Sequence, residues 1–117
     1  MRHGKGNKKL SKPTDQRIAL LRSLSIALFI NERIETTTVR AKEAQRMIDK
    51  VITLGKDGSL HSRRLALKII PNVTVISKVF NDIAPRFTER PGGYTRMINT
   101  GFRRGDAASL SILEFVD

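Results

Sequence analysis

The sequence contains no cysteine, and only 5% of its 117 residues are aromatic. Without cysteine, the chain forms no disulfide, no thiolate zinc site and no cysteine nucleophile. No apolar run approaches the ~20 residues that a membrane-spanning helix requires. These absences exclude a disulfide-stapled scaffold, a thiol-dependent enzyme and a helical membrane span.

Acidic residues are also scarce. The chain has 11 Asp and Glu against 22 Lys and Arg, which gives a net charge of +11 and a pI near 10.9. Such an imbalance opposes the compact state by self-repulsion and favours a polyanionic partner. Nucleic acid is the first candidate, and an anionic membrane surface is the second. The length indicates one domain, and at this size folding buries somewhat over ~60% of the unfolded surface, so a core forms without staples.

Groups that perform catalysis are few and dispersed. The two histidines, His3 and His61, fall on separate segments, and no pair of carboxylates has the spacing to share a helix face in an apolar setting. Residues 4–6 and 92–93 contain glycines but lack the spacing and the Lys-Ser/Thr of a phosphate-binding loop. We therefore predict no enzymatic activity, no cofactor, no metal site and no small-molecule substrate.

Residues 1–12 are basic throughout, with no acid and with Leu10 as the one aliphatic residue after the initiator. Such a segment buries too little apolar surface to offset its ordering entropy, which predicts an extended basic N-terminal arm that folds against nucleic acid. A merely solubilising tail is the alternative. The basic side chains of the arm are Arg2, His3, Lys5, Lys8, Lys9 and Lys12.

Residues 13–117 are predicted to form a single globular domain with about four helices. The first begins near Thr14, its candidate N-cap, and the second runs from Thr37 or Thr38 to Gly55. The third is capped by Ser59 and ends at Ile70. The fourth is capped by Asn72 and ends at Ala84, before Pro85. Helical spacing then gives the predicted core faces. These are Ile18, Leu21, Leu24, Ser25, Leu28 and Phe29; Ala41, Ala44, Ile48, Val51 and Ile52; Leu60, Leu67 and Ile70; and Val73, Ile76, Val79, Phe80 and Ile83.

Three segments have the alternation and β-branched content of strands. Residues 94–100 and 109–116 are predicted to pair as an antiparallel hairpin over a loop at 101–108, and residues 33–37 are a candidate third strand. Helices that pack on one small sheet make an α+β domain.

Residues 85–108 are explained least well by folding alone. They carry five arginines, three aromatic residues and the pair Gly92-Gly93. Guanidinium groups bind phosphates, aromatic rings stack on unpaired bases, and glycines allow a close approach of the backbone. An exposed hairpin with a solvated charged face is the alternative. Tyr94 either stacks on a base or packs in the hairpin, and Asp106 is expected to shape its own loop by accepting backbone N–H groups.

Other cations extend this candidate surface. Arg17 and Arg22 follow the arm, and Arg63 and Arg64 are adjacent on the short third helix. The second helix is interpreted mainly as scaffold, with Glu43 and Arg46 as an ordinary surface pair three residues apart.

Several motifs together resemble those of a known family. They are Met1-Arg2-His3, Arg33-Ile34-Glu35-Thr36-Thr37, Ile52-Thr53-Leu54, Arg63-Arg64, Ala84-Pro85-Arg86, Gly92-Gly93-Tyr94-Thr95-Arg96, Gly105-Asp106 and Glu114-Phe115-Val116. The chain resembles, over essentially its whole length, the bacterial large-subunit ribosomal protein seventeen family. The resemblance implies a structural constituent of the large ribosomal subunit that binds 23S ribosomal RNA near the exit side of the peptide tunnel. It implies neighbouring ribosomal proteins as further partners, no membrane, and a cytoplasmic ribosome of a bacterium or the ribosome of an organelle.

We hypothesise that ribosomal RNA is held between the arm and the arginine-rich hairpin. The alternative is a DNA-compacting or regulatory protein, which the sequence disfavours because no helix carries base-reading side chains in the helix-turn-helix manner. The predicted RNA-binding residues are Arg2, His3, Lys5, Lys8, Lys9, Lys12, Arg17, Arg22, Arg63, Arg64, Arg86, Arg90, Gly92, Gly93, Tyr94, Arg96, Arg103 and Arg104.

Overall fold

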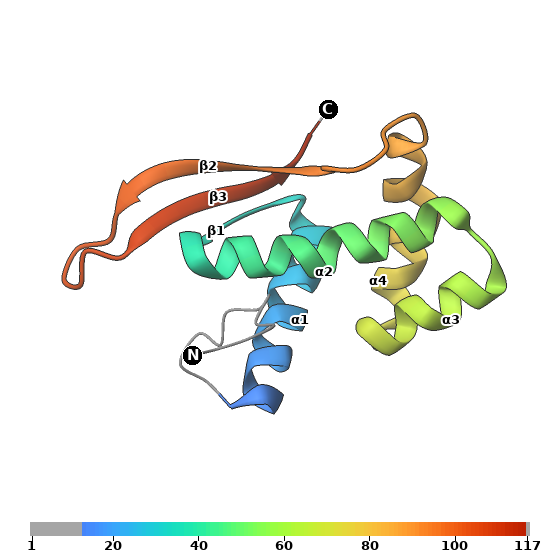
Figure 1. Cartoon of the computed structure of the whole chain (residues 1–117), viewed down its shortest axis with the longest axis horizontal. Coiled ribbons are helices and arrows are strands. Elements are labelled where there is room, and N and C mark those ends of the chain that lie inside the picture. Colours follow the sequence, from blue (N-terminus) through green and yellow to red (C-terminus); the bar gives the residue numbers. More distant parts are fainter. Residues whose placement is uncertain (1–12, 117) are drawn as a thin grey trace, which may run out of the picture.

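The computed structural model of the chain describes residues 13–116. It is an α+β domain, as the sequence predicts, in which helices pack against one small sheet (Figure 1). Its elements are α1 (Thr14–Asn31), β1 (Arg33–Thr37), α2 (Thr38–Asp57), α3 (Leu60–Ile69), α4 (Val73–Lys78), the π-helical turn η1 (Val79–Ile83), the 3₁₀ turn η2 (Ala84–Phe87), β2 (Thr95–Phe102) and β3 (Ser109–Phe115).

The sheet has the strand order β1-β3-β2, and both pairings are antiparallel. The predicted hairpin and the predicted third strand are therefore confirmed. Leu113 lies opposite Ile34 on β1 and opposite Met97 on β2. Alternate residues of β3, including Leu113 and Phe115, are buried against the helices, so the other side of this strand faces away from the core.

Helix α2 is the centre of the core. All five residues predicted to face inward from it are fully buried, and Leu28 and Phe29 of α1 are buried with them. The ring of Phe29 stacks on Phe115 of β3 with 6.1 Å between ring centroids. Because α2 contacts α1, α3 and all three strands, it fixes the relative positions of the surfaces described below.

The second helix continues past Gly55, which is where the sequence predicts its end. A Cβ added at Gly55 would lie 2.8 Å from the Cβ of Ala84, so the glycine allows η2 to approach α2 closely. The helix ends instead at Asp57 and is capped by Gly58, which has φ 72° and donates its N–H to the carbonyl of Leu54 at 3.1 Å. The predicted end at Gly55 is therefore wrong by two residues.

The predicted caps of the third and fourth helices are confirmed. Ser59 accepts the N–H of Ser62, and Asn72 accepts that of Val75. The first apolar residue of each helix, in contrast, is not in the core. Leu60 is 64% exposed and Val73 is 70% exposed, because each begins its helix on the solvent side, and Ala66 and Val75 are buried instead.

Two further helix boundaries differ from the prediction. Pro13 occupies the N-cap position of α1 without a side-chain hydrogen bond, and Thr14 is already helical. The fourth helix is the second case, because the chain does not leave helical geometry at its predicted end, Ala84. Pro85 sits in the first turn of η2, where its missing N–H costs little, and the 3₁₀ turn carries the buried Phe87 into the core.

Candidate nucleic-acid interface

One third of the predicted RNA-binding residues fall on the basic arm. The arm spans residues 1–12 and lies outside the described residues, so its role stays a prediction. These residues are Arg2, His3, Lys5, Lys8, Lys9 and Lys12.

Arg86 is held by the protein's own acids. Its guanidinium donates to both carboxylate oxygens of Glu32, at 2.6 and 3.1 Å, and to Asp82 at 3.0 Å. The hydrogen bond to Glu32 raises the pKa of Arg86, and the same bond lowers the pKa of Glu32. Glu32 also caps α1 with a left-handed φ of 66°. Arg86 therefore ties the 3₁₀ turn to the corner between α1 and β1.

Three other arginines of the 85–108 stretch also have partners within the domain. Arg90 donates Nε to the carbonyl of Gly93 at 3.1 Å, and Arg96 reaches Glu114 on the neighbouring strand at 3.2 Å. Arg103 forms a two-point ion pair with Asp106, at 3.2 and 2.5 Å. All of these side chains lie at the surface, where such pairs are weak, so each arginine keeps part of its capacity for an external anion.

Asp106 organises the hairpin loop, as the sequence predicts. It accepts the N–H of Ala108 at 3.2 Å in addition to the guanidinium of Arg103, and these contacts lower the pKa of Asp106 to about 2, with the Arg103 hydrogen bond as the larger cause. Arg104 lies in the same loop and is exposed. Its side chain makes no hydrogen bond or ion pair with any described residue.

Tyr94 belongs to the core. It is 1% exposed, and its ring packs against Phe87 with 5.3 Å between centroids. Its hydroxyl lies 3.2 Å from the hydroxyl of Thr53 and 3.1 Å from Nζ of Lys56. Burial raises the pKa of the Asp49 carboxyl, and the backbone of Tyr94 opposes this shift. Of the two roles open to Tyr94, the structure shows packing, which corrects its inclusion among base-stacking candidates.

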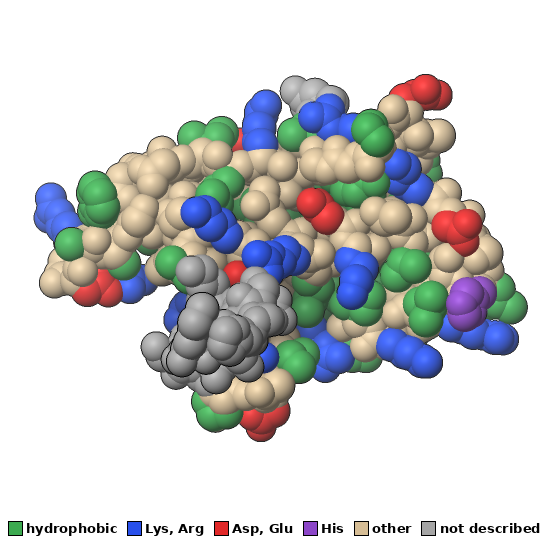
Figure 2. Space-filling model, viewed as in Figure 1, with side chains coloured by type: hydrophobic (Ala, Val, Ile, Leu, Met, Phe, Trp, Pro, Cys, Tyr) green, Lys and Arg blue, Asp and Glu red, His purple; other side chains and the backbone are tan. Residues whose placement is uncertain are grey.

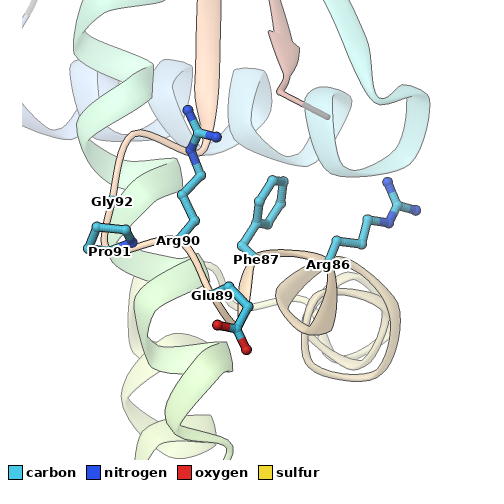
Figure 3. Close-up of a pocket in the computed structure, with 6 residues that line it drawn as sticks. All are labelled: Arg86, Phe87, Glu89, Arg90, Pro91 and Gly92. Atoms are coloured by element: carbon cyan, nitrogen blue, oxygen red, sulfur yellow. The ribbon is translucent and has the colours of Figure 1, made fainter.

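Gly92 and Gly93 lie in the loop after η2, beside an open hollow of about 560 Å³. Figure 3 shows the side chains of Arg86 and Arg90 extending on opposite sides of Phe87, so the two guanidinium groups do not converge there. A Cβ added at either glycine meets no atom within 4 Å, and Gly93 has φ 64°. The turn conformation therefore favours glycine at position 93, and neither glycine is needed for internal packing.

Arg22 has an internal role in the fold. Its Nε donates to the carbonyl of Ile69 at 2.7 Å and its terminal nitrogen to that of Lys68 at 3.2 Å, which satisfies carbonyls at the C-terminal end of α3. The side chain of Arg17, five residues earlier on α1, makes no hydrogen bond or ion pair with a described residue and lines a groove described below.

The adjacent arginines of α3 differ in their surroundings. The guanidinium carbon of Arg63 lies 4.7 Å from the centroid of the Phe80 ring, which orients the charge by a cation–π contact. Arg64 is exposed and makes no hydrogen bond or ion pair with the described residues.

The structure adds a row of cations that the sequence interpretation missed. Lys42, Arg46 and Lys50 are exposed and four residues apart on α2, which places them on one helix face. This spacing is visible in the sequence, but the apparent surface pair of Glu43 with Arg46 favours interpreting the helix as scaffold. Glu43 is also not the surface residue that was expected, since it is only 5% exposed.

The row borders a groove of about 400 Å³ between α1 and α2. Three cations and one acid line it, over a floor of apolar side chains from α1, α2 and α3. Figure 2 shows Lys and Arg side chains spread along the visible face from the hairpin to the α3 end, with fewer acidic ones between them. The lining residues are Arg17, Ile18, Leu21, Glu43, Arg46, Met47, Lys50 and Ile69.

The described residues contain no group of three His, Cys, Asp or Glu arranged to hold a metal ion. Among the helices of residues 13–116, none combines the length and the apolar content that crossing a membrane requires.

Comparison with known proteins gives a consistent family. Residues 20–116 match the model of the family described as ribosomal protein L17. A protein of Thermodesulfovibrio yellowstonii named large ribosomal subunit protein bL17 is 50% identical over 117 residues, which cover 100% of this chain and 88% of the relative. Proteins of the same name from Syntrophus aciditrophicus and Clostridium tetani are 46% and 50% identical, covering 99% and 95% of this chain and 93% and 98% of their own lengths. The chain therefore belongs to the ribosomal protein L17 family, a family of structural proteins of the large ribosomal subunit and not of enzymes.

Proposed function

We propose that this protein is a structural constituent of the large ribosomal subunit that binds and stabilises large-subunit (23S) ribosomal RNA. The observation that carries the proposal is the net charge of +11 in a chain whose exposed cations are only partly paired with its own acids. Basic surfaces of this kind supply the counterion-release term that dominates binding to nucleic acid. Membership of a ribosomal family supports RNA as the polyanion.

The predicted residues divide into two groups by their internal contacts. Arg17, Arg64 and Arg104, together with the arm, offer charges that phosphates neutralise directly. Lys42 and Lys50, which are exposed on α2, extend this set. The anchored cations contribute less to affinity and more to the shape of the surface, and they are Arg22, Arg63, Arg86, Arg90, Arg96 and Arg103. Gly92 and Gly93 permit a close approach of the RNA backbone.

The finer placement near the exit side of the peptide tunnel is also a proposal, and its support is the family resemblance. It makes neighbouring large-subunit proteins the second class of partner and a bacterial cytoplasmic or an organellar ribosome the location. Cross-linking between this protein and a stalled nascent chain that emerges from purified ribosomes tests the placement. Cross-links only to proteins that lie far from the tunnel exit would contradict it.

The RNA proposal is tested by titrating the purified chain against labelled large-subunit RNA fragments and against duplex DNA of equal length. If six or more phosphates are neutralised, affinity for RNA falls by roughly a thousandfold or more between about 50 and 200 mM salt. At equal salt the RNA fragments should compete better than the duplex. A flat salt response would overturn the electrostatic mechanism, and preference for the duplex would favour the DNA-binding alternative.

A further inference from the structure

The tip of the hairpin carries an aromatic ring that the fold does not use. Phe102 ends β2 and is 74% exposed, which is the highest exposure among the large hydrophobic side chains of residues 13–116 that lie at the surface. Its partner in the sheet is Ser109, whose hydroxyl lies 2.8 Å from that of Thr38, the first residue of α2. Helix α2 therefore begins at the level of this pair, and Figure 1 shows the hairpin extending past that end of the helix.

The strand is irregular just before this ring. The register of β2 on β3 shifts between Asn99 and Gly101, and Gly101 has φ 122°, a conformation that side-chain-bearing residues rarely adopt. Asn99 stabilises the irregularity by accepting the N–H of Gly101 at 3.1 Å and donating to Ser109 at 2.9 Å. The bulge lies directly before Phe102 and is held by these hydrogen bonds.

The loop beyond the ring is closed by its own hydrogen bonds. Arg103 donates its backbone N–H to the carbonyl of Ala108 at 2.8 Å, and Ala107 donates to the carbonyl of Arg103 at 3.0 Å. The pair of Arg103 with Asp106 spans the same loop. The charge of Arg103 is therefore used internally, whereas the neighbouring Arg104 is exposed and free of contacts with the described residues.

An exposed aromatic face next to an unpaired guanidinium, on a loop that is already ordered, has a specific chemistry. The ring offers a stacking surface to an unpaired nucleobase, and the guanidinium offers a bidentate donor to the adjacent phosphate. A preorganised loop loses little conformational entropy on binding. A protein pocket also accepts a phenylalanine, but in a chain of charge +11 a free arginine two positions away favours a polyanion.

We propose that Phe102 stacks on an unpaired base of the bound RNA and that Arg104 binds a phosphate beside it. The proposal rests on the proposed RNA-binding function and specifies one contact within it. It also assigns to Phe102 the role that the sequence left open for Tyr94, because Tyr94 is enclosed in the core.

The absence of tryptophan from the chain supplies a direct test. Phe102→Trp introduces a single indole at the proposed contact, and Val73→Trp introduces one at a position that is 70% exposed on α4, an element with no predicted RNA-binding residue. Addition of the large-subunit RNA fragments should quench the fluorescence of the first variant strongly and that of the second weakly. Equal quenching, or none at position 102 while RNA binds, would overturn the proposal.

Binding by further variants separates stacking from simple apolar contact. Phe102→Leu should weaken RNA binding by roughly fivefold to a hundredfold, which corresponds to the loss of one base–aromatic contact, and Phe102→Tyr should retain the affinity. Retention of full affinity by the leucine variant would contradict stacking. Since the side chain is exposed, neither variant should alter the melting temperature.

If the native chain binds RNA in a salt-dependent way and substitution of Phe102 has no effect, this inference alone is refuted. If the native chain does not bind RNA, the proposed function is refuted as well.

Discussion

At the scale of single residues, the same side-chain type serves two purposes in this molecule. Arg86 is bound by Glu32, which lies 54 positions away in the chain, whereas Arg104 meets no described partner. The sequence shows that arginines cluster in residues 85–108. It does not show which of these arginines form hydrogen bonds or ion pairs within the domain. The distinction depends on contacts between residues that are distant in sequence. The sequence therefore locates the arginine-rich segment but does not show which of its arginines are available to an external partner.

Gly55 allows the closest approach between α2 and η2, and it provides a prediction at this scale. Gly55→Ala places a methyl group 2.8 Å from the Cβ of Ala84, both inside the core. Overpacking of this kind costs about 1–3 kcal/mol, which exceeds the gain of about 1 kcal/mol from replacing a helical glycine. We expect a net destabilisation of roughly 1 kcal/mol in urea unfolding.

The matched control for this substitution is Gly92→Ala, because a Cβ at Gly92 meets nothing within 4 Å. It should leave the unfolding midpoint unchanged. Combining Gly55→Ala with Ala84→Gly removes the opposing methyl group, and the double variant should be more stable than the sum of the two single effects. A Gly55→Ala protein as stable as the native one would show that the two segments separate without cost.

At the scale of elements, local signals predicted more than the long-range arrangement. The strand at 33–37 and the caps at Ser59 and Asn72 follow from β-branched runs and hydrogen-bonding side chains, which act within a few residues. The end of α2 was misplaced because a glycine is a turn signal in isolation, and only the packing of Ala84 reveals its other use. Leu60 and Val73 were assigned to the core because periodicity identifies a face but not where that face begins.

Helix α2 has a buried face and a basic exposed face, and the sequence interpretation used only the buried one. The opposite face presents Lys42 and Lys50, both exposed and without hydrogen bonds or ion pairs to the described residues. Glutamine keeps a helix propensity close to that of lysine, so Lys42→Gln with Lys50→Gln should preserve folding. We expect this double variant to bind RNA more weakly and to lower the slope of log affinity against log salt by about 1 to 2.

Lys78→Gln is the control for the α2 row. Lys78 already lies 3.7 Å from Glu32 and donates to the carbonyl of Ile30 at 3.2 Å, so its charge is partly engaged. Its loss should change the salt slope by less than either substitution on α2. A double variant with native affinity and native slope would mean that the α2 face does not meet the RNA.

At the scale of the whole molecule, the apolar core and the surplus charge act in opposite directions. The core joins residues of α1, α2, α4 and the sheet into one cluster, while the net charge of +11 on the whole chain opposes a compact state by self-repulsion. A bound polyanion would relieve this repulsion, so the proposed RNA binding should also stabilise the fold. Periodicity along the whole chain predicts the fold class. Composition predicts that the partner carries negative charge.

Deletion of residues 1–12 tests how this charge is divided between the arm and the body. The buried cluster of the described domain extends from Leu28 to Phe115, so the melting temperature should stay within about 3 °C of the native value. The deletion removes five Lys and Arg, and it should reduce the salt slope of RNA binding by up to about 4. Calorimetry and RNA titration measure the two effects separately.

Charge and chain length are distinguished by a full-length variant in which the same five cations, Arg2, Lys5, Lys8, Lys9 and Lys12, are replaced by glutamine. If the arm acts by neutralising phosphates, this variant should reproduce the loss of slope that the deletion causes, because counterion release depends on charge and not on length. The deletion could instead lower the melting temperature strongly while the glutamine variant does not. This outcome would show that the arm packs against the domain and that its apolar and backbone contacts stabilise the fold.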